Sequence, residues 1–157
     1  MTLLKSYYHL CKPNVVYMML ICAFVGMLLA EQTVSSYSYL FIALTGIALC
    51  AASAAAINQV VDREADASMT RTDQRPLPKG NLSVQHASIF AFVIGLIGAL
   101  ILYFYVNILT MILTIGSLIG YAFIYTVYLK RATPQNIVIG GLAGAAPPLL
   151  GWSSVSN

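Results

Sequence analysis

Charged residues and cysteines are both scarce in this sequence, and each scarcity excludes a class of protein. Asp, Glu, Lys and Arg make up only 8% of the 157 residues, against 59% hydrophobic residues and a mean hydropathy of +0.81. Soluble domains carry roughly 25% charged residues, so the composition predicts an integral membrane protein. The cysteines Cys11, Cys22 and Cys50 are odd in number and lack a C-x-x-C spacing, which argues against a disulfide framework or a zinc site.

The sequence contains five long runs of apolar residues. They cover residues 14–30, 38–61, 84–105, 108–129 and 136–152. Each run is close to the ~17–25 residues that cross a bilayer as a helix, and none alternates as a membrane strand does. The expected fold class is therefore all-α, a polytopic transmembrane helix bundle with about five helices of this chain in the lipid bilayer.

Basic residues are absent from residues 31–37 and 106–107, the two connections expected on the outer side of the membrane. All eight lie on the opposite side: Lys5, Lys12, Arg63, Arg71, Arg75, Lys79, Lys130 and Arg131. By the positive-inside rule, this segregation predicts a cytoplasmic N-terminus. The net charge of +3 then reflects membrane orientation, and nucleic-acid binding is not indicated. The N-terminus does not resemble an Arg- and Ser-rich transit peptide, which favours a bacterial inner membrane.

A cleaved signal peptide is the alternative interpretation of the first apolar run. Lys5 and Lys12 would form its basic region, and Leu28-Leu29-Ala30 a weak cleavage site. Further apolar runs follow, so an uncleaved first helix is favoured.

A ladder of polar side chains ends the second apolar run. Asn58, Asp62 and Asp66 are four residues apart, and in an α-helix this spacing places all three on one face. Carboxylate and amide oxygens are hard ligands, and Mg²⁺ commonly binds through one or two carboxylates plus substrate phosphates. Asn58 also lies inside an apolar helix, where an amide needs an internal partner. The ladder predicts a metal–diphosphate site beside the membrane.

The longest polar segment, residues 62–83, holds four of the five acidic residues and four of the eight basic ones. We expect it to form a cytoplasmic substrate-binding loop. Arg71 and Arg75 suit bidentate recognition of phosphate, and Lys79 can act as a mobile point charge. The alternative is that these charges only keep a cytoplasmic loop solvated and fix its topology.

Several further blocks accompany the ladder in a fixed order. They are Lys12-Pro13, Asn58-x-x-x-Asp62-x-x-x-Asp66, Met69-x-Arg71-Thr72-x-x-Arg75-Pro76-Leu77-Pro78, Tyr125-Thr126-x-x-Leu129-Lys130-Arg131-x-Thr133-Pro134-Gln135-Asn136, and Gly140-Gly141-x-x-Gly144-Ala145-Ala146-Pro147-Pro148 with Gly151-Trp152. Together they resemble the UbiA-type intramembrane prenyltransferases, and in particular the members that farnesylate haem.

The resemblance implies transfer of a farnesyl group from farnesyl diphosphate to a vinyl group of haem B, with water adding to give the side chain of haem O. Haem B would be a substrate rather than a retained cofactor, and terminal-oxidase assembly proteins are candidate partners. The implied catalytic and Mg²⁺-binding residues are Asn58, Asp62 and Asp66. The implied substrate-binding residues are Arg71, Arg75, Lys79, Lys12, Tyr125, Lys130 and Arg131, although orientation alone would explain Lys12, Lys130 and Arg131, and packing would explain Tyr125.

The sequence departs from the family in one respect. These enzymes have a second aspartate-rich motif and a bundle of about nine spans, whereas no acidic residue follows Asp73 here. We therefore expect residues 1–157 to be the N-terminal portion of a single transmembrane prenyltransferase domain, and to be inactive alone.

Two other functions remain open at this stage. One is a prenyltransferase for 4-hydroxybenzoate or another aromatic acceptor, since only the resemblance favours haem. The other is a small membrane transporter or channel subunit, because intramembrane polar residues often mark ion pathways. The ladder argues against transport, since its carboxylates gather at one interface rather than at the bilayer midplane. His9 and His86 are candidate haem contacts, but an interfacial histidine is more often merely solvated.

Overall fold

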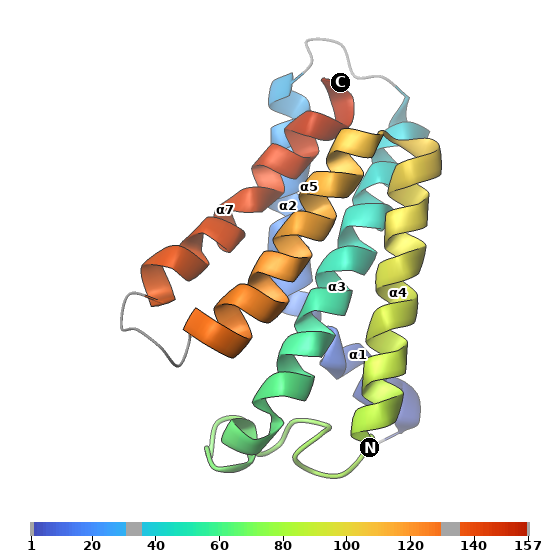
Figure 1. Cartoon of the computed structure of the whole chain (residues 1–157). Coiled ribbons are helices and arrows are strands. Elements are labelled where there is room, and N and C mark those ends of the chain that lie inside the picture. The colour runs from blue at the N-terminus through green and yellow to red at the C-terminus, as the bar shows by residue number, and fades with distance from the viewer. Residues whose placement is uncertain (1, 31–35, 130–135, 157) are drawn as a thin grey trace.

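Helices account for all the regular secondary structure among the described residues, which are 2–30, 36–129 and 136–156 of this computed structural model. They are α1 (Leu3–Leu10), α2 (Pro13–Ala30), α3 (Tyr37–Ala67), α4 (Val84–Tyr105), α5 (Ile108–Ile119), the π-helix η1 (Gly120–Leu129) and α7 (Asn136–Val155). The long helices run alternately up and down side by side, with the N-terminus at one end of the bundle and the C-terminus at the other (Figure 1). The expected all-α fold class is confirmed.

Four helices among the described residues are long and apolar enough to cross a membrane. They are α2, α3, α4 and the continuous stretch Ile108–Thr126, which combines α5 with most of η1. The fifth expected span coincides with α7, a helix of 20 residues. In α3, 50% of the most apolar window is buried inside the bundle, against 17–22% in the other three. The protein is an integral membrane protein in which α3 is the central helix.

Small residues bring α3 and α4 close together. A Cβ atom added to Gly98 would lie 2.8 Å from Cys50 Sγ and 2.9 Å from the carbonyl oxygen of Gly46. Ser53, further along α3, donates a hydrogen bond of 2.7 Å to the carbonyl oxygen of Ala91 on α4. Without a hydrophobic driving force between helices in lipid, such close packing and interhelical hydrogen bonds hold α4 against α3.

Helices α2 and α7 approach even more closely. A Cβ atom added to Gly151 would lie 1.9 Å from the carbonyl oxygen of Ala23, and one added to Gly26 would lie 2.1 Å from that of Pro148. The two backbones can approach this closely only because the residue on one side of each contact is a glycine. The glycines therefore fix α7 against α2 on one side of the bundle.

Substituting Gly151 by alanine is expected to destabilise the protein by ~1–3 kcal/mol, since overpacking forces backbone shifts. Gly141→Ala, on the same helix, is the control, because no atom of the described residues lies within 4 Å of the added Cβ atom. Alanine is the better helix former by about 1 kcal/mol, so Gly141→Ala should be neutral or stabilising. Thermal unfolding in detergent, followed by circular dichroism, measures both. Equal midpoints for the two variants would contradict the packing described for α2 and α7.

Helix α3 continues beyond its apolar part, so the polar segment expected as a loop from residue 62 begins within a helix. Residues 62–67 form its last turns, and non-helical backbone starts at Ser68. No glycine or proline lies between Gly46 and Pro76, so no helix breaker in the sequence ends α3 earlier. Turns then lead back to α4, which starts after Ser83, whose hydroxyl accepts a hydrogen bond of 3.2 Å from the backbone N–H of His86. Asp62 and Asp66 are consequently held on a rigid helix.

Candidate functional site

The three residues of the ladder lie on the last turns of α3, at the end of the bundle that also carries α1 and residues 68–83 (Figure 1). Their spacing places them on one face of the helix. Asn58, Asp62 and Asp66 are only 4%, 6% and 5% exposed. Lys, Glu, Arg and Asp are almost never this buried unless paired, so the site must contain partners for both carboxylates.

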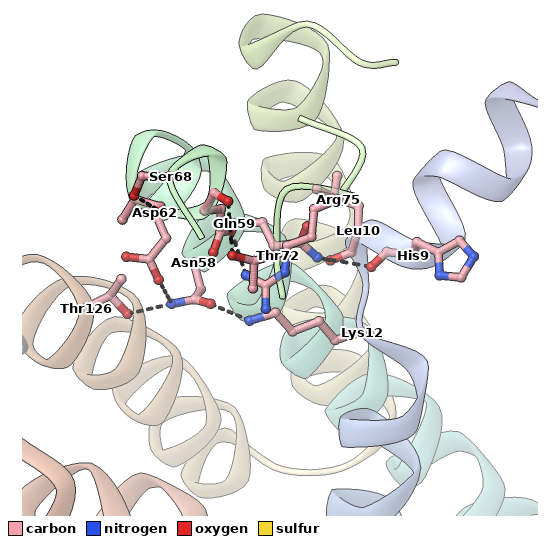
Figure 2. A network of polar contacts seen from close by, with 12 residues as sticks. His9, Leu10, Lys12, Asn58, Gln59, Asp62, Ser68, Thr72, Arg75 and Thr126 are labelled. Atoms are coloured by element: carbon pink, nitrogen blue, oxygen red, sulfur yellow. Dashed lines mark hydrogen bonds and ion pairs between the residues drawn. The ribbon is translucent and has the colours of Figure 1, made fainter. Parts of the chain in front are cut away.

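Asn58 connects three segments of the chain (Figure 2). Its amide oxygen accepts a hydrogen bond from Lys12 Nζ. Its amide nitrogen donates to Asp62 Oδ2 at 3.1 Å and to Thr126 Oγ1 at 3.2 Å. A single side chain thus joins the α1–α2 corner, α3 and η1, and the orientation of its amide is fixed by a donor on one side and two acceptors on the other.

The corner between α1 and α2 is built to present Lys12. Lys12 has a φ of 49°, in the left-handed region that residues other than glycine rarely adopt. Gln59 Nε2 holds the end of α1 in place by donating to the carbonyl oxygens of His9 (3.0 Å) and Leu10 (2.9 Å). Strained backbone of this kind persists where the surroundings determine it, often at functional sites. Here it turns the lysine towards Asn58.

Asp66 is paired with the segment that follows α3. Arg75 Nη1 lies 2.6 Å from Asp66 Oδ2, and the arginine side chain is 30% exposed. The hydroxyl of Thr72 donates a 3.0 Å hydrogen bond to the carbonyl oxygen of Asp66. The charge-assisted contact between Arg75 and Asp66 holds residues 68–83 over the end of α3 and places a guanidinium group beside the carboxylates.

The donor set suits a divalent cation that shares its coordination with phosphate. Within the described ranges, no three His, Cys, Asp or Glu side chains gather as a metal site. Asp62 and Asp66 place two buried carboxylates on adjacent turns of α3. Mg²⁺ is commonly held by one or two carboxylates plus substrate phosphates. The residues therefore fit Mg²⁺ as a partial site that a diphosphate would complete. In this structure the Asn58 amide oxygen faces Lys12, so Asn58 acts as a bridge between lysine and carboxylate.

The other expected substrate-binding residues are less closely gathered. Arg71 and Lys79 are exposed on the segment that carries Arg75. Tyr125 is half-buried on η1, and its ring stacks on that of Tyr121 with centroids 5.5 Å apart and planes 15° apart. Lys130 and Arg131 lie outside the described residues. His9 and His86, the candidate haem contacts, are both exposed.

Thr126 belongs to the site, although sequence reasoning did not assign it a role. It is fully buried, and its hydroxyl donates to the carbonyl oxygen of Tyr121 at 2.7 Å while accepting from Asn58. The bond reaches five residues back along η1, as the wider turn of a π-helix allows, and π-turns are frequent at functional sites. The block that begins with Tyr125-Thr126 was the only signal in the sequence, because helix type is not readable from apolar composition.

Replacing Thr126 by valine should loosen Asn58 without changing side-chain volume. We expect turnover to fall roughly tenfold, since one of the two acceptors that orient the amide is lost. Thr126→Ser should restore most of the activity. The control is Thr45→Val, which removes only a 2.7 Å bond to the carbonyl oxygen of Phe41 within α3. Prenyl transfer by the protein expressed from its complete reading frame is the measurement, and an unchanged rate in Thr126→Val would contradict a positioning role.

An apolar cavity of about 240 Å³ opens beside the ladder. Its wall includes Ala51, Ala54 and Ala55 on the turns of α3 that precede Asn58, and Lys12 is its one charged lining residue among those described. Small side chains on the central helix leave this space, and residues of α2, α5, η1 and α7 complete its mainly apolar lining. A cation and two carboxylates thus stand beside a chamber that suits a hydrocarbon.

Known proteins with similar sequences were also found. The chain is 59% identical over 153 residues to protoheme IX farnesyltransferase 2 of Pseudoalteromonas atlantica, and 59% identical to protoheme IX farnesyltransferase of Idiomarina loihiensis. It is 56% identical to protoheme IX farnesyltransferase of Shewanella oneidensis. Each comparison covers 98% of this chain and 50–51% of the relative, so the chain spans about half the length of the curated relatives it matches.

No solved structure matches the chain. Residues 19–157, which include the ladder, η1 and α7, match the UbiA prenyltransferase family. The chain belongs to the UbiA prenyltransferase family.

Proposed function

We propose that the protein transfers a farnesyl group from farnesyl diphosphate to a vinyl group of haem B. Its relatives are named protoheme IX farnesyltransferases, and protoheme IX is haem B. The observation that carries the proposal is the position of two buried carboxylates and a lysine beside an apolar cavity. A prenyl diphosphate has the complementary form, with an anionic head and a hydrocarbon tail. The chain spans half of its relatives, so the proposal concerns the protein expressed from its complete reading frame.

The chemistry begins with cleavage of the bond between the first farnesyl carbon and the diphosphate oxygen. Diphosphate leaves with the electron pair, and the allylic cation forms a carbon–carbon bond with a vinyl group of haem B. Water adds to the other vinyl carbon and releases a proton, which gives a hydroxyethylfarnesyl side chain. When bound, Mg²⁺ would neutralise charge on the leaving diphosphate. The apolar cavity would keep bulk water from the cation.

Each expected site residue has a proposed role. Asp62 and Asp66 would hold Mg²⁺, and Asn58 would link this pair to Lys12. Lys12 and Arg75 would contact phosphate oxygens, because both already lie among the buried polar groups of the site. The residues proposed to join them around the substrate are Arg71, Lys79, Tyr125, Lys130 and Arg131.

The proposed setting is a bacterial inner membrane with a cytoplasmic N-terminus. Helix α1, the α1–α2 corner and residues 68–83 lie at one end of the bundle (Figure 1). They carry Lys5, Lys12, Arg71, Arg75 and Lys79, and the positive-inside rule places this end in the cytoplasm. In this orientation the site faces the cytoplasm. Terminal-oxidase assembly proteins are proposed partners, and residues 68–83 form the proposed cytoplasmic substrate-binding loop.

Haem extracted from cells tests this function. The complete reading frame is expressed in bacteria that cannot make haem O, and the extracted haems are analysed by mass spectrometry. We expect haem B carrying a hydroxyethylfarnesyl group in place of a vinyl group. Unmodified haem B alone would contradict the proposal, and a prenylated 4-hydroxybenzoate would identify the second prenyltransferase function instead.

A further inference from the structure

The apolar cavity is elongated along the helices that line it. On each of the helices that enclose it, the lining residues extend from the end near Asn58 towards the opposite end of the bundle. The residues farthest from Asn58 on these helices are Met19 on α2, Ile47 on α3, Thr114 on α5 and Leu150 on α7. Ile47 and Leu150 are only 1% and 2% exposed and belong to the hydrophobic core. Residues of the hydrophobic core therefore line the end of the cavity farthest from Asn58, and this end is its floor.

The depth of this pocket follows from helix geometry. Ile47 precedes Asn58 by eleven residues on α3, which corresponds to about 16 Å along the axis. Ala51 precedes Asn58 by seven residues, or about 10 Å. Three extended main-chain bonds advance ~3.5 Å, so an extended geranyl chain spans about 9 Å, farnesyl about 14 Å and geranylgeranyl about 19 Å. A farnesyl chain is therefore shorter than the distance from Asn58 to Ile47 along α3, whereas a geranylgeranyl chain is longer.

We propose that Ile47 and Leu150 limit the length of the prenyl chain, and that the small side chain of Ala51 makes room for its third isoprene unit. With the diphosphate beside Lys12 and Asn58, the first two isoprene units of the donor lie between Asn58 and Ala51 along α3. The third unit passes Ala51 and ends near the floor. This inference rests on the proposed function, because it specifies which prenyl donor the same site takes.

Enlarging Ala51 tests the inference. Ala51→Leu is compared with wild type, each expressed from its complete reading frame, for kcat/KM with geranyl, farnesyl and geranylgeranyl diphosphate and haem B as acceptor. We expect the farnesyl-to-geranyl ratio to fall at least about tenfold. Ala52→Leu is the matched control, because Ala52 lines a separate groove between the α1–α2 corner and α3. Its ratio should equal that of wild type.

A second variant opens the floor and covers the case in which Ala51→Leu does not fold. Ile47→Ala should raise the geranylgeranyl-to-farnesyl ratio at least about tenfold. Unchanged ratios in a folded Ala51→Leu protein or in Ile47→Ala, or equal shifts in Ala52→Leu, would overturn the inference and leave the proposed function intact. If wild type transfers no prenyl group to haem from any donor, the proposed function itself fails, and the inference fails with it.

Discussion

Substituting Asp62 by alanine should reduce farnesyl transfer by at least about 10³-fold in the protein expressed from its complete reading frame. Asp62 is 6% exposed and accepts a hydrogen bond from Asn58. Removing it would leave one carboxylate of the pair to hold Mg²⁺ and would weaken neutralisation of the leaving diphosphate. The measurement is the rate of haem O formation in membranes with farnesyl diphosphate and haem B supplied in excess.

Glu64→Ala is the control for Asp62→Ala. Glu64 is also on the last turns of α3, but its side chain is 85% exposed and, within the described part of the chain, its one ion pair is with its neighbour Arg63. An exposed pair of this kind contributes little to stability, so Glu64→Ala should keep the wild-type rate. Asp62→Ala should remain folded, since it removes a buried charge. Normal turnover by Asp62→Ala, or equal losses in the two variants, would contradict the assignment of the carboxylates.

Lys12→Met is expected to lower kcat/KM for farnesyl diphosphate roughly 100-fold, mainly through a weaker interaction with the leaving group. Methionine keeps an unbranched chain but removes the ammonium group that donates to Asn58 Oδ1. Steady-state kinetics over a range of farnesyl diphosphate concentrations provides the measurement. Lys12→Arg should retain more activity, because its charge can still reach phosphate.

Topology is the main alternative explanation for Lys12, since a positive charge before the first span also orients the protein. Lys5→Met removes one positive charge from α1 at an exposed position and serves as the matched control. It should retain wild-type kinetics and expression. If Lys5→Met and Lys12→Met lose activity equally, orientation rather than diphosphate binding would explain both lysines.

The sequence predicted the helices and the ladder well, because both depend on local patterns. Continuous apolar runs predict membrane helices, and a four-residue spacing places side chains on one face whatever surrounds the helix. The extent of α3 was less predictable. Asp62 and Asp66 were expected at the start of a loop, yet the absence of a helix breaker lets α3 run to Ala67. Polarity marks the membrane boundary, and it does not by itself end a helix.

Contacts between distant segments were not predictable. The bond from Lys12 to Asn58 depends on a left-handed residue at the α1–α2 corner, and the bond from Asn58 to Thr126 depends on a π-helix. Neither conformation has a signature in local composition. The same holds for the three loop cations, of which Arg75 contacts Asp66 while Arg71 and Lys79 are exposed. The charge pattern predicted which segment carries the cations, but only the fold shows which of the three contacts a carboxylate.

Metal binding tests the central claim most directly. Mn²⁺ replaces Mg²⁺ as a paramagnetic probe, and its binding to the protein from the complete reading frame is followed by electron paramagnetic resonance with and without farnesyl thiodiphosphate, a slowly reacting donor analogue. We expect Mn²⁺ to bind together with the analogue, and this binding to be lost in Asp62→Ala and Asp66→Ala but kept in Glu64→Ala. Equal Mn²⁺ binding in all three variants and the wild type would show that the buried face of α3 does not hold the metal.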